Sequence, residues 1–354
     1  MRRAAATIGL LAGLCLGTTA GSALAQTVGI VAPLSGPMQI LGRQVETGGR
    51  LAASALKLNV VVADDACTEE GGKAAAEALI SAKVTAVVGF LCNEAAIAAL
   101  PLLKDAGIPA ITLGVRANGL TDTREKTDWP VYRLGPRADS ERDAVGTLMT
   151  RLWRDELFAI VDDGTIYGRE LAESFRAAAE QAGLKAVMVD TFRPAMENQV
   201  GLVGRLRRSG ATHVFVGGDA DDIAIMARDA KGMGASMTFA GGETLRMPTG
   251  TAAIAPGTIM IGLPDLAEAA PASVARRFRT ADIIPEGYML PAYAGVEIVA
   301  QAGKSSADAL KTLGTETFET AVGPIRFDTK GDLADNPFRT FRFDGSTFIP
   351  LEDQ

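Results

Sequence analysis

Short runs rich in valine and isoleucine alternate with longer stretches of alanine and leucine along most of the chain, and this alternation constrains the fold more than any other feature. Parallel strands buried on both faces read as continuous apolar runs, and a crossover helix follows each one. The pattern therefore predicts doubly wound α/β sheets. In the first half we expect strands at 28–31, 58–63, 85–90 and 109–113, with helices at 42–56, 70–81 and 94–106.

A second series of the same kind follows Pro136. Its expected strands are at 158–162, 186–189, 213–217, 238–241 and 258–263, and its expected helices at 140–153, 167–182, 199–209 and 221–232. Residues 272–303 read as mostly helical with an interruption at Ile284 and Pro285, and the runs 338–343 and 347–350 alternate like a terminal hairpin. Because a single core rarely grows beyond about 250–300 residues, we expect two lobes.

The first 25 residues are predicted to be a secretory signal peptide. Arg2 and Arg3 form a basic start, residues 7–15 form an apolar run, and residues 23–25 form a small-residue cleavage site. Removal of this segment leaves 329 of the 354 residues and changes the formal charge from −7 to −9, because both arginines are lost. Cys15 follows Leu14, which makes a poor lipidation signal. We therefore expect an acidic, soluble protein of the periplasm.

The charge and the histidine count argue against several functions. A net-negative chain without a cluster of lysine or arginine lacks the basic surface that nucleic-acid binding needs. Beyond the signal segment no apolar run approaches the roughly 20 residues that span a bilayer, so we do not expect membrane insertion. His213 is the only histidine and lies within a predicted strand, which favours a packed side chain over a catalytic or zinc-binding one. We expect no catalytic residue, no metal and no cofactor.

Two cysteines, Cys67 and Cys92, remain after the signal segment is removed. An even pair in an oxidising compartment favours a disulfide. A single catalytic or metal-binding cysteine is the alternative at this point.

The ends of the predicted strands are where we expect a ligand. In open α/β sheets, ligands bind outside the carboxyl ends of the strands. A cleft between two such sheets would draw residues from both. The residues that follow the predicted strands are 34–37, 64–65, 92–93, 114–116, 162–167, 218–219 and 242–243.

These strand ends carry the motifs of a known family. Residues 28–37 read Val-Gly-Ile-Val-Ala-Pro-Leu-Ser-Gly-Pro; then come Asp-Asp-Ala-Cys at 64–67, Val-Gly-Phe-Leu-Cys at 88–92, Asp-Ala-Gly-Ile-Pro at 105–109, Tyr-Gly at 167–168, Gly-Pro-Ile-Arg-Phe-Asp at 323–328 and Lys-Gly-Asp at 330–332. In this order and spacing, essentially the whole mature chain resembles the periplasmic leucine/isoleucine/valine-binding protein family of ABC importers.

The resemblance implies a type I periplasmic binding fold, in which two doubly wound, Rossmann-like lobes are joined by a multi-strand hinge. It places residues 26–134 and 264–327 in the N-terminal lobe. It places residues 135–263 and 328–354 in the C-terminal lobe.

The resemblance also assigns the cysteines and the first part of a ligand site. The family's disulfide joins the positions of Cys67 and Cys92. The ligand carboxylate of the family lies at the start of the helix after the second cysteine, where free N–H groups favour an anion. Asn93 occupies that position, with helix capping as the alternative or additional role. The next binding loop of the family matches Gly114, Val115 and Arg116.

Arg116 departs from the family pattern, in which a threonine-type hydroxyl is usual. A guanidinium clamps a carboxylate with two parallel hydrogen bonds, so an inward Arg116 would fit a ligand with extra negative charge. The alternatives are a solvated arginine and a pair with Glu243. Glu243 itself matches the acidic residue of the family that receives the ligand ammonium, with a plain helix-start acid as its alternative.

Five further positions are candidates for contact with the ligand. Asp219 and Leu41 stand where the family often has aromatic residues, and both differences alter the pocket. Tyr167 and Tyr288 are expected to cover the ligand, with ordinary packing as the alternative. Ser35 offers a hydroxyl or an amide, although a turn explains it equally well.

The function implied by the resemblance is solute capture. A monomer would take up an amino acid or related small carboxylate and deliver it, unchanged, to the transmembrane subunits of an ABC permease. A sensor that reports the ligand to a receptor is an alternative. A third is an exported hydrolase that uses Asp162, Asp163, Asp219 or Glu243, although we expect Asp162 and Asp163 to cap the following turn.

Overall fold

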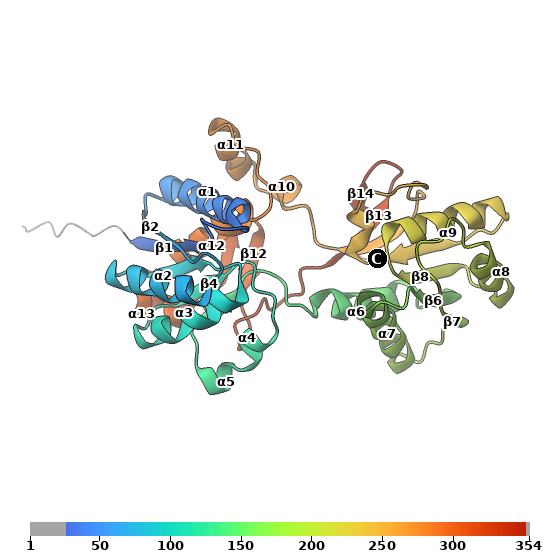
Figure 1. Cartoon of the computed structure of the whole chain (residues 1–354), viewed down its shortest axis with the longest axis horizontal. Coiled ribbons are helices and arrows are strands. Elements are labelled where there is room, and N and C mark those ends of the chain that lie inside the picture. Colours follow the sequence, from blue (N-terminus) through green and yellow to red (C-terminus); the bar gives the residue numbers. More distant parts are fainter. Residues whose placement is uncertain (1–25, 352–354) are drawn as a thin grey trace, which may run out of the picture.

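The structure is a computed structural model that describes residues 26–351, so the predicted signal peptide lies outside the described residues. Two separate α/β lobes lie at opposite ends of the long axis of the molecule (Figure 1). Each lobe is built around its own sheet, of five strands in the first and seven in the second. Within residues 26–351, no helix combines the length and apolar character needed to cross a bilayer.

The sheet of the first lobe is parallel throughout, in the order β2-β1-β3-β4-β5. The sequence pattern predicts the first four strands and misses the fifth, because the charged Arg133 ends the apolar run of that strand after two residues. β3 and β4 are entirely buried, as strands covered by helices on both faces must be. The strands are β1 (Thr27–Ala32), β2 (Asn59–Asp64), β3 (Ala86–Gly89), β4 (Ala110–Thr112) and β5 (Val131–Arg133).

Helices cover both faces of this sheet and divide its core in two. Residues of α1 (Gln39–Leu56), α12 (Met289–Ala302) and α13 (Ser306–Thr312) share one apolar cluster. Residues of α2 (Glu69–Ser81) and α3 (Asn93–Asp105) form the other. The smaller elements are α4 (Gly119–Asp122), α5 (Arg124–Thr127), α10 (Leu266–Ala269), α11 (Ala272–Thr280) and the antiparallel pair β11 (Thr317–Thr320) and β12 (Gly323–Arg326).

The predicted interruption of the late helical segment is confirmed. α11 ends at Thr280 and α12 begins at Met289, so Ile284 and Pro285 lie in the loop between them. A proline inside a helix removes one backbone hydrogen bond and clashes with the preceding turn. The loop leads into Tyr288, the residue before α12, which packs against the first core cluster and lines a cavity together with residues of the passages between the lobes.

The second sheet has the order β14-β13-β10-β9-β8-β6-β7. Five parallel strands are followed by an antiparallel pair, which confirms the predicted terminal hairpin. The strands are β6 (Phe158–Asp162), β7 (Met188–Thr191), β8 (His213–Gly217), β9 (Thr238–Gly241), β10 (Ile259–Gly262), β13 (Arg339–Phe343) and β14 (Phe348–Pro350). Its helices are α6 (Ser140–Leu152), α7 (Ile166–Gln181), α8 (Val200–Ser209) and α9 (Ala220–Gly232), with a 3₁₀ turn, η1 (Glu243–Arg246).

His213 is a packing residue in this sheet. Its ring lies 5.1 Å from the Trp153 ring, between centroids, and its Nδ1 lies 3.3 Å from a Glu156 carboxylate oxygen. Burial lowers the pKa of His213. The prediction of a packed histidine agrees with this environment, at the first residue of β8.

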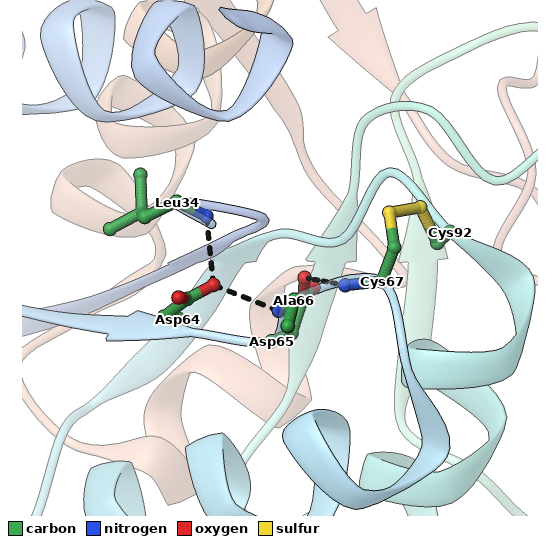
Figure 2. Close-up of a disulfide and its surroundings, with 6 residues drawn as sticks. All are labelled: Leu34, Asp64, Asp65, Ala66, Cys67 and Cys92. Atoms are coloured by element: carbon green, nitrogen blue, oxygen red, sulfur yellow. Dashed lines mark hydrogen bonds between the residues drawn. A yellow bond between two sulfur atoms is a disulfide. The ribbon is translucent and has the colours of Figure 1, made fainter. Parts of the chain in front are cut away.

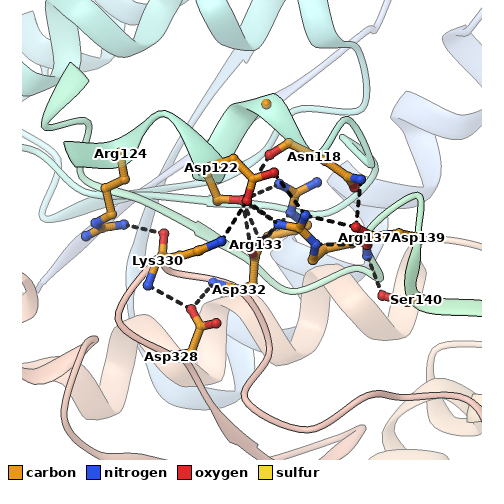
Figure 3. A network of polar contacts seen from close by, with 12 residues as sticks. Asn118, Asp122, Arg124, Arg133, Arg137, Asp139, Ser140, Asp328, Lys330 and Asp332 are labelled. Atoms are coloured by element: carbon orange, nitrogen blue, oxygen red, sulfur yellow. Dashed lines mark hydrogen bonds and ion pairs between the residues drawn. The ribbon is translucent and has the colours of Figure 1, made fainter. Parts of the chain in front are cut away.

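The chain passes between the two sheets three times: from β5 to α6, from β10 to α10 and from β12 to β13. These three passages form the hinge region seen at the centre of Figure 1. A set of charged and polar side chains, which we call the hinge network, connects the first and third passages (Figure 3). Its members are Thr121, Asp122, Arg133, Arg137, Asp139, Lys330 and Asp332.

Asp332 is the centre of the hinge network and is almost completely buried. The fully buried Arg133 donates from Nε to its Oδ1 at 2.8 Å, and Arg137 donates to its Oδ2 at 2.7 Å. The Thr121 hydroxyl donates to the same carboxylate. Two partners of Asp332, Thr121 and Arg133, belong to the first lobe, and the third, Arg137, lies in the first passage, although the sequence boundary at residue 328 assigns Asp332 to the second lobe. The exact lobe boundaries stay a prediction.

Candidate functional site

The loops after β2 and β3 carry the first part of the candidate site, and a disulfide joins them (Figure 2). Cys67 and Cys92 are bonded, with their Cα atoms 5.2 Å apart, which confirms the predicted pair. The Cys67 N–H donates to Asp65 Oδ1 at 3.0 Å. Ala66, Cys67 and Phe90 adopt positive φ angles, a conformation that is uncommon for residues other than glycine. The covalent bond thus fixes two loops that hold an unfavourable backbone shape.

Ser35 belongs to the turn beside this disulfide. Leu34 and Ala66 each donate a backbone N–H to Asp64 Oδ1 at 2.8 Å. Burial alone would raise the pKa of Asp64, but hydrogen bonds from the Ser35 hydroxyl and from these amides outweigh it and hold the pKa below its usual range. The Ser35 hydroxyl is therefore engaged by Asp64, which favours the turn-forming role among the two that the sequence left open.

Asn93 is the first residue of α3. Cys92 occupies the N-cap position, and no side chain there caps the helix. The helix-capping role predicted for Asn93 is therefore wrong, because the residue already lies inside the helix. The first intrahelical bond of α3 joins the Ala96 N–H to the Cys92 carbonyl at 3.2 Å. The amides before Ala96 have no partner within the helix, as at any helix start.

The three residues of the loop after β4 have different surroundings. A Cβ on Gly114 would lie 3.0 Å from the Tyr288 hydroxyl, so the glycine leaves room for that ring. Val115 is 3 % exposed and belongs to the apolar core between the sheet and α3. Arg116 is exposed and lines a cavity. The side chain of Val115 thus contributes to the core, whereas Gly114 and Arg116 lie at the cavity wall.

This cavity has a volume of about 550 Å³ and lies in the hinge region. Its wall is mainly apolar and carries Arg116, Arg326 and Arg339 against one acid, Asp335. Of the residues predicted to bind ligand, it brings together Gly114, Arg116 and Tyr288. The three passages between the lobes supply much of the rest: Leu134, Gly135, Pro136, Leu263, Pro264, Leu266, Leu333 and Pro337.

A second group of predicted residues meets on the other lobe. The Tyr167 hydroxyl donates to Glu141 Oε1 at 2.8 Å, and the Glu243 N–H donates to the same oxygen at 2.7 Å. A Cβ at Gly242 would collide with both the Glu141 carboxylate and the Tyr167 hydroxyl, so only glycine allows this approach. We call Glu141, Tyr167, Gly242 and Glu243 the Glu141 cluster. Its arrangement agrees with Tyr167 and Glu243 sharing one site.

Glu141 is the residue of this group that the sequence analysis missed. It lies in the first turn of α6, where an acid usually complements the helix dipole and attracts no further interpretation. Burial raises the pKa of Glu141, although the Glu243 N–H, the Tyr167 hydroxyl and the charge of Arg116 act in the opposite direction. The sequence feature that could have indicated a role in the site is its position, five residues after Pro136 and close to the passage between the lobes.

Glu243 has a different partner from the one the sequence suggested. Its Oε1 accepts the Leu263 N–H at 3.2 Å and lies 3.9 Å from Arg246 Nε. The suggested pair with Arg116 is therefore wrong in this structure, since Arg246 supplies the nearby charge. Glu243 lines a second cavity of about 470 Å³, which shares Leu263, Pro264, Leu266 and Gly287 with the first.

Leu41 and Asp219 lie outside the walls of both cavities. Leu41 is half-buried in α1 and packs against the first core cluster. Asp219 is exposed, directly before α9, and its side chain makes no capping hydrogen bond. Contacts of these two residues with a ligand stay predictions.

The acids after β6 cap the next turn, as the sequence predicts. Asp162 Oδ1 accepts the Gly164 N–H at 2.9 Å, and Asp163 Oδ1 accepts the Thr165 N–H at 2.9 Å and its hydroxyl at 2.6 Å. Both carboxylates are occupied by the turn that leads into α7. This arrangement argues against their use as an acid–base pair.

Comparison with known proteins identifies what this chain is similar to. Residues 25–347 match the family model described as "Periplasmic binding protein". A protein of Brucella melitensis called Leu/Ile/Val-binding protein homolog 3 is 27% identical over 97% of this chain and 99% of its own length. Among solved structures, a protein from Rhodospirillum rubrum has a TM-score of 0.77 at 17% identity, covering 93% of this chain and 100% of that one.

A solute-binding protein from R. palustris, solved in complex with 4-hydroxybenzoate, has a TM-score of 0.58 at 15% identity, covering 93% of this chain and 96% of that one. At such identities the solved structures show a shared fold.

Proposed function

Since the chain belongs to the periplasmic binding protein family, we propose that it captures an amino acid or related small carboxylate between its lobes and delivers it to an ABC permease. The cavity at the hinge carries the proposal, because its walls come from both lobes and all three passages. A relative named for Leu/Ile/Val binding and a similar fold seen with 4-hydroxybenzoate both support a small carboxylate as ligand.

The charges on the two sides of the cleft support the same proposal. Arg116 lies on the first lobe, and the Glu141 cluster lies on the second. A guanidinium pairs with a carboxylate through two hydrogen bonds, and the free amides at the start of α3 favour an anion. The carboxylate of the ligand would then bind to the first lobe, and the other groups of the ligand would contact the second lobe.

Transport requires that binding changes the shape of the protein, and the hinge allows this. Only a closed form lets both lobes contact one ligand, so the ligand stabilises that form and shifts the population toward it. The closed form, acting as a monomer in the periplasm, would then be the one that the permease recognises. No bond of the ligand is made or broken in this scheme.

A thermal-shift screen of the purified mature protein tests the proposal. The panel contains L-amino acids, dicarboxylates and benzoates, because these classes share a carboxylate and differ in everything else. A ligand at a hundredfold excess over its Kd stabilises the native state by about 2.7 kcal/mol. A protein that no member of the panel stabilises would contradict the proposal, and so would a ligand recovered in altered form.

Arg116→Ala provides the matched test of the first-lobe contact. Loss of a charge-assisted hydrogen bond costs about 1.5–3 kcal/mol of binding, so carboxylate ligands should bind at least tenfold more weakly. Arg326→Ala is the control, since Arg326 lines the same cavity without matching a ligand-binding position of the family. Equal effects of the two substitutions would indicate a general charge effect.

A further inference from the structure

The carboxylate of Glu141 is held in one orientation by three elements of the second lobe. Glu141 comes from α6, the hydroxyl of Tyr167 from α7, and the N–H of Glu243 from the start of η1. Both donors bind the same oxygen, Oε1. Their hydrogen bonds, together with the absence of a Cβ at Gly242, place this carboxylate without using its second oxygen.

Glu141 also lacks a positive partner on its own lobe. Among residues 26–351, it forms no ion pair within 4 Å, whereas Glu243 has Arg246 at 3.9 Å and the Leu263 N–H at 3.2 Å. Burial raises the pKa of Glu141, and the positive charge of Arg116 on the first lobe partly offsets this rise. Burying a carboxylate without a counter-ion is unfavourable. Glu141 is therefore the acid of this cluster whose charge is left for a cation to balance.

We propose that Glu141, rather than Glu243, receives the ammonium group of the ligand. The inference rests on the proposed function and narrows it, because it assigns the ligand to the α-amino acids instead of the simple carboxylates. The carboxylate of such a ligand would face Arg116 on the first lobe, and its ammonium would face the free oxygen of Glu141 on the second. Glu243 would then act as a positioning residue, since its backbone N–H orients Glu141.

The ligand charge separates this role from a purely structural one. The probes are L-leucine, L-phenylalanine, L-alanine and L-glutamate, each compared with the 2-hydroxy acid of the same carbon skeleton. A hydroxy acid keeps the carboxylate and the side chain and lacks the ammonium. Substitution of a residue that binds the ammonium must weaken binding of the amino acid more than binding of the hydroxy acid. A substitution that disturbs the fold weakens binding of both ligands equally.

The experiment measures Kd by calorimetry for each pair with the wild type and with Glu141→Gln, Glu243→Gln and Glu170→Gln. Glu170 is an exposed acid of α7 and serves as the control. Glu141→Gln should weaken binding of the amino acid about 10- to 150-fold, the range for a hydrogen bond to a charged group, and the hydroxy acid by less than about threefold. Glu243→Gln should leave the preference for the amino acid nearly intact, and Glu170→Gln should change neither value.

The possible results are distinct. Loss of the amino-acid preference in Glu243→Gln but not in Glu141→Gln would overturn the inference and return the ammonium to Glu243. A wild type that binds hydroxy acids as tightly as amino acids would overturn it as well, while leaving solute capture in place. A wild type that binds none of these probes, nor any other carboxylate, would overturn the proposed function itself. Tyr167→Phe, which removes one of the two hydrogen bonds that orient Glu141, should weaken binding of the amino acid more than binding of the hydroxy acid, and equal effects on both would contradict the orienting role.

Discussion

The hinge network places a buried carboxylate, Asp332, beside a lobe passage, and the Glu141 cluster places a half-buried one, Glu141, in a similar position, yet the two carboxylates have different partners. In the hinge network, Asp332 has two arginines and a threonine hydroxyl within hydrogen-bond distance. In the Glu141 cluster, the hydrogen-bond donors to Glu141 from residues 26–351 are one hydroxyl and one backbone amide. Full compensation suits a residue that holds the fold together, whereas an uncompensated charge suits one that binds a cation. The contrast predicts opposite consequences of removing each acid.

The largest expected effect is that of Asp332→Ala. Arg133 would then remain fully buried without its counter-ion, and breaking a buried pair in this way costs about 3–5 kcal/mol of unfolding free energy. Urea denaturation of the purified protein measures the change. Asp335→Ala, at an exposed aspartate three residues further on, should stay within about 0.5 kcal/mol. A change of similar size in both variants would remove the distinction drawn for Asp332.

The next largest effect is expected from removing the disulfide. This bond fixes two loops of the first lobe, whereas the loops of the Glu141 cluster in the second lobe are held by hydrogen bonds. Replacing Cys67 and Cys92 together by alanine should lower the unfolding free energy by roughly 3 kcal/mol, since the bond closes a long loop in the unfolded chain. Chemical denaturation without reductant gives the value. Added reductant should destabilise the wild type and leave the double variant unchanged; a reductant-insensitive wild type would contradict the assignment.

A smaller effect of opposite sign is expected for Glu141→Gln in the absence of ligand. The amide keeps an oxygen for the Tyr167 hydroxyl and the Glu243 N–H but removes a partly desolvated charge. Stability at pH 7 should therefore be unchanged or higher by up to about 1 kcal/mol. Thermal unfolding of the ligand-free protein tests this. A loss of more than about 2 kcal/mol would show that the charge of Glu141 is structural, as in a buried ion pair.

The smallest effect concerns pH, and its sign differs between the two regions. The hydrogen bond from Arg137, with a further one from Lys330, lowers the pKa of Asp122 from 3.8 to about 2. Asp122 therefore stabilises the fold above pH 3.8, and this contribution is lost as the pH falls toward 2. Its side chain is 40% exposed, so screening limits the contribution to less than about 1 kcal/mol.

Burial raises the pKa of Glu141 above 4.5, so its contribution runs the other way. It is present below pH 4.5 and is lost as the pH rises through the folded pKa. Urea midpoints between pH 2 and pH 7 separate the two groups. In Asp122→Asn the urea midpoint should change less between pH 2 and pH 3.8 than in the wild type. In Glu141→Gln it should change less above pH 4.5. The same change in both variants would contradict these assignments.

The core of the protein follows directly from local sequence patterns. The runs that become β3 and β6 are apolar at nearly every residue, and Ile284 and Pro285 lie in the loop between α11 and α12. Local hydrophobicity and backbone sterics decide such features, and both are properties of neighbouring residues. The strand β5 escaped prediction because the charged Arg133 ends its apolar run after Val131 and Tyr132.

The sequence by itself determined two α/β lobes, the strand ends that carry the candidate site, and the pair of cysteines that joins two of those ends. Only the tertiary structure decided which charges meet. Glu141 and Glu243 are 102 residues apart in sequence, and Arg133 and Asp332 are 199 apart. Strand and helix periods extend over a few residues, whereas an ion pair depends on where two distant segments are brought by packing. For that reason the sequence does not distinguish Asp332, which has two arginine partners, from Glu141, which has none within 4 Å among residues 26–351.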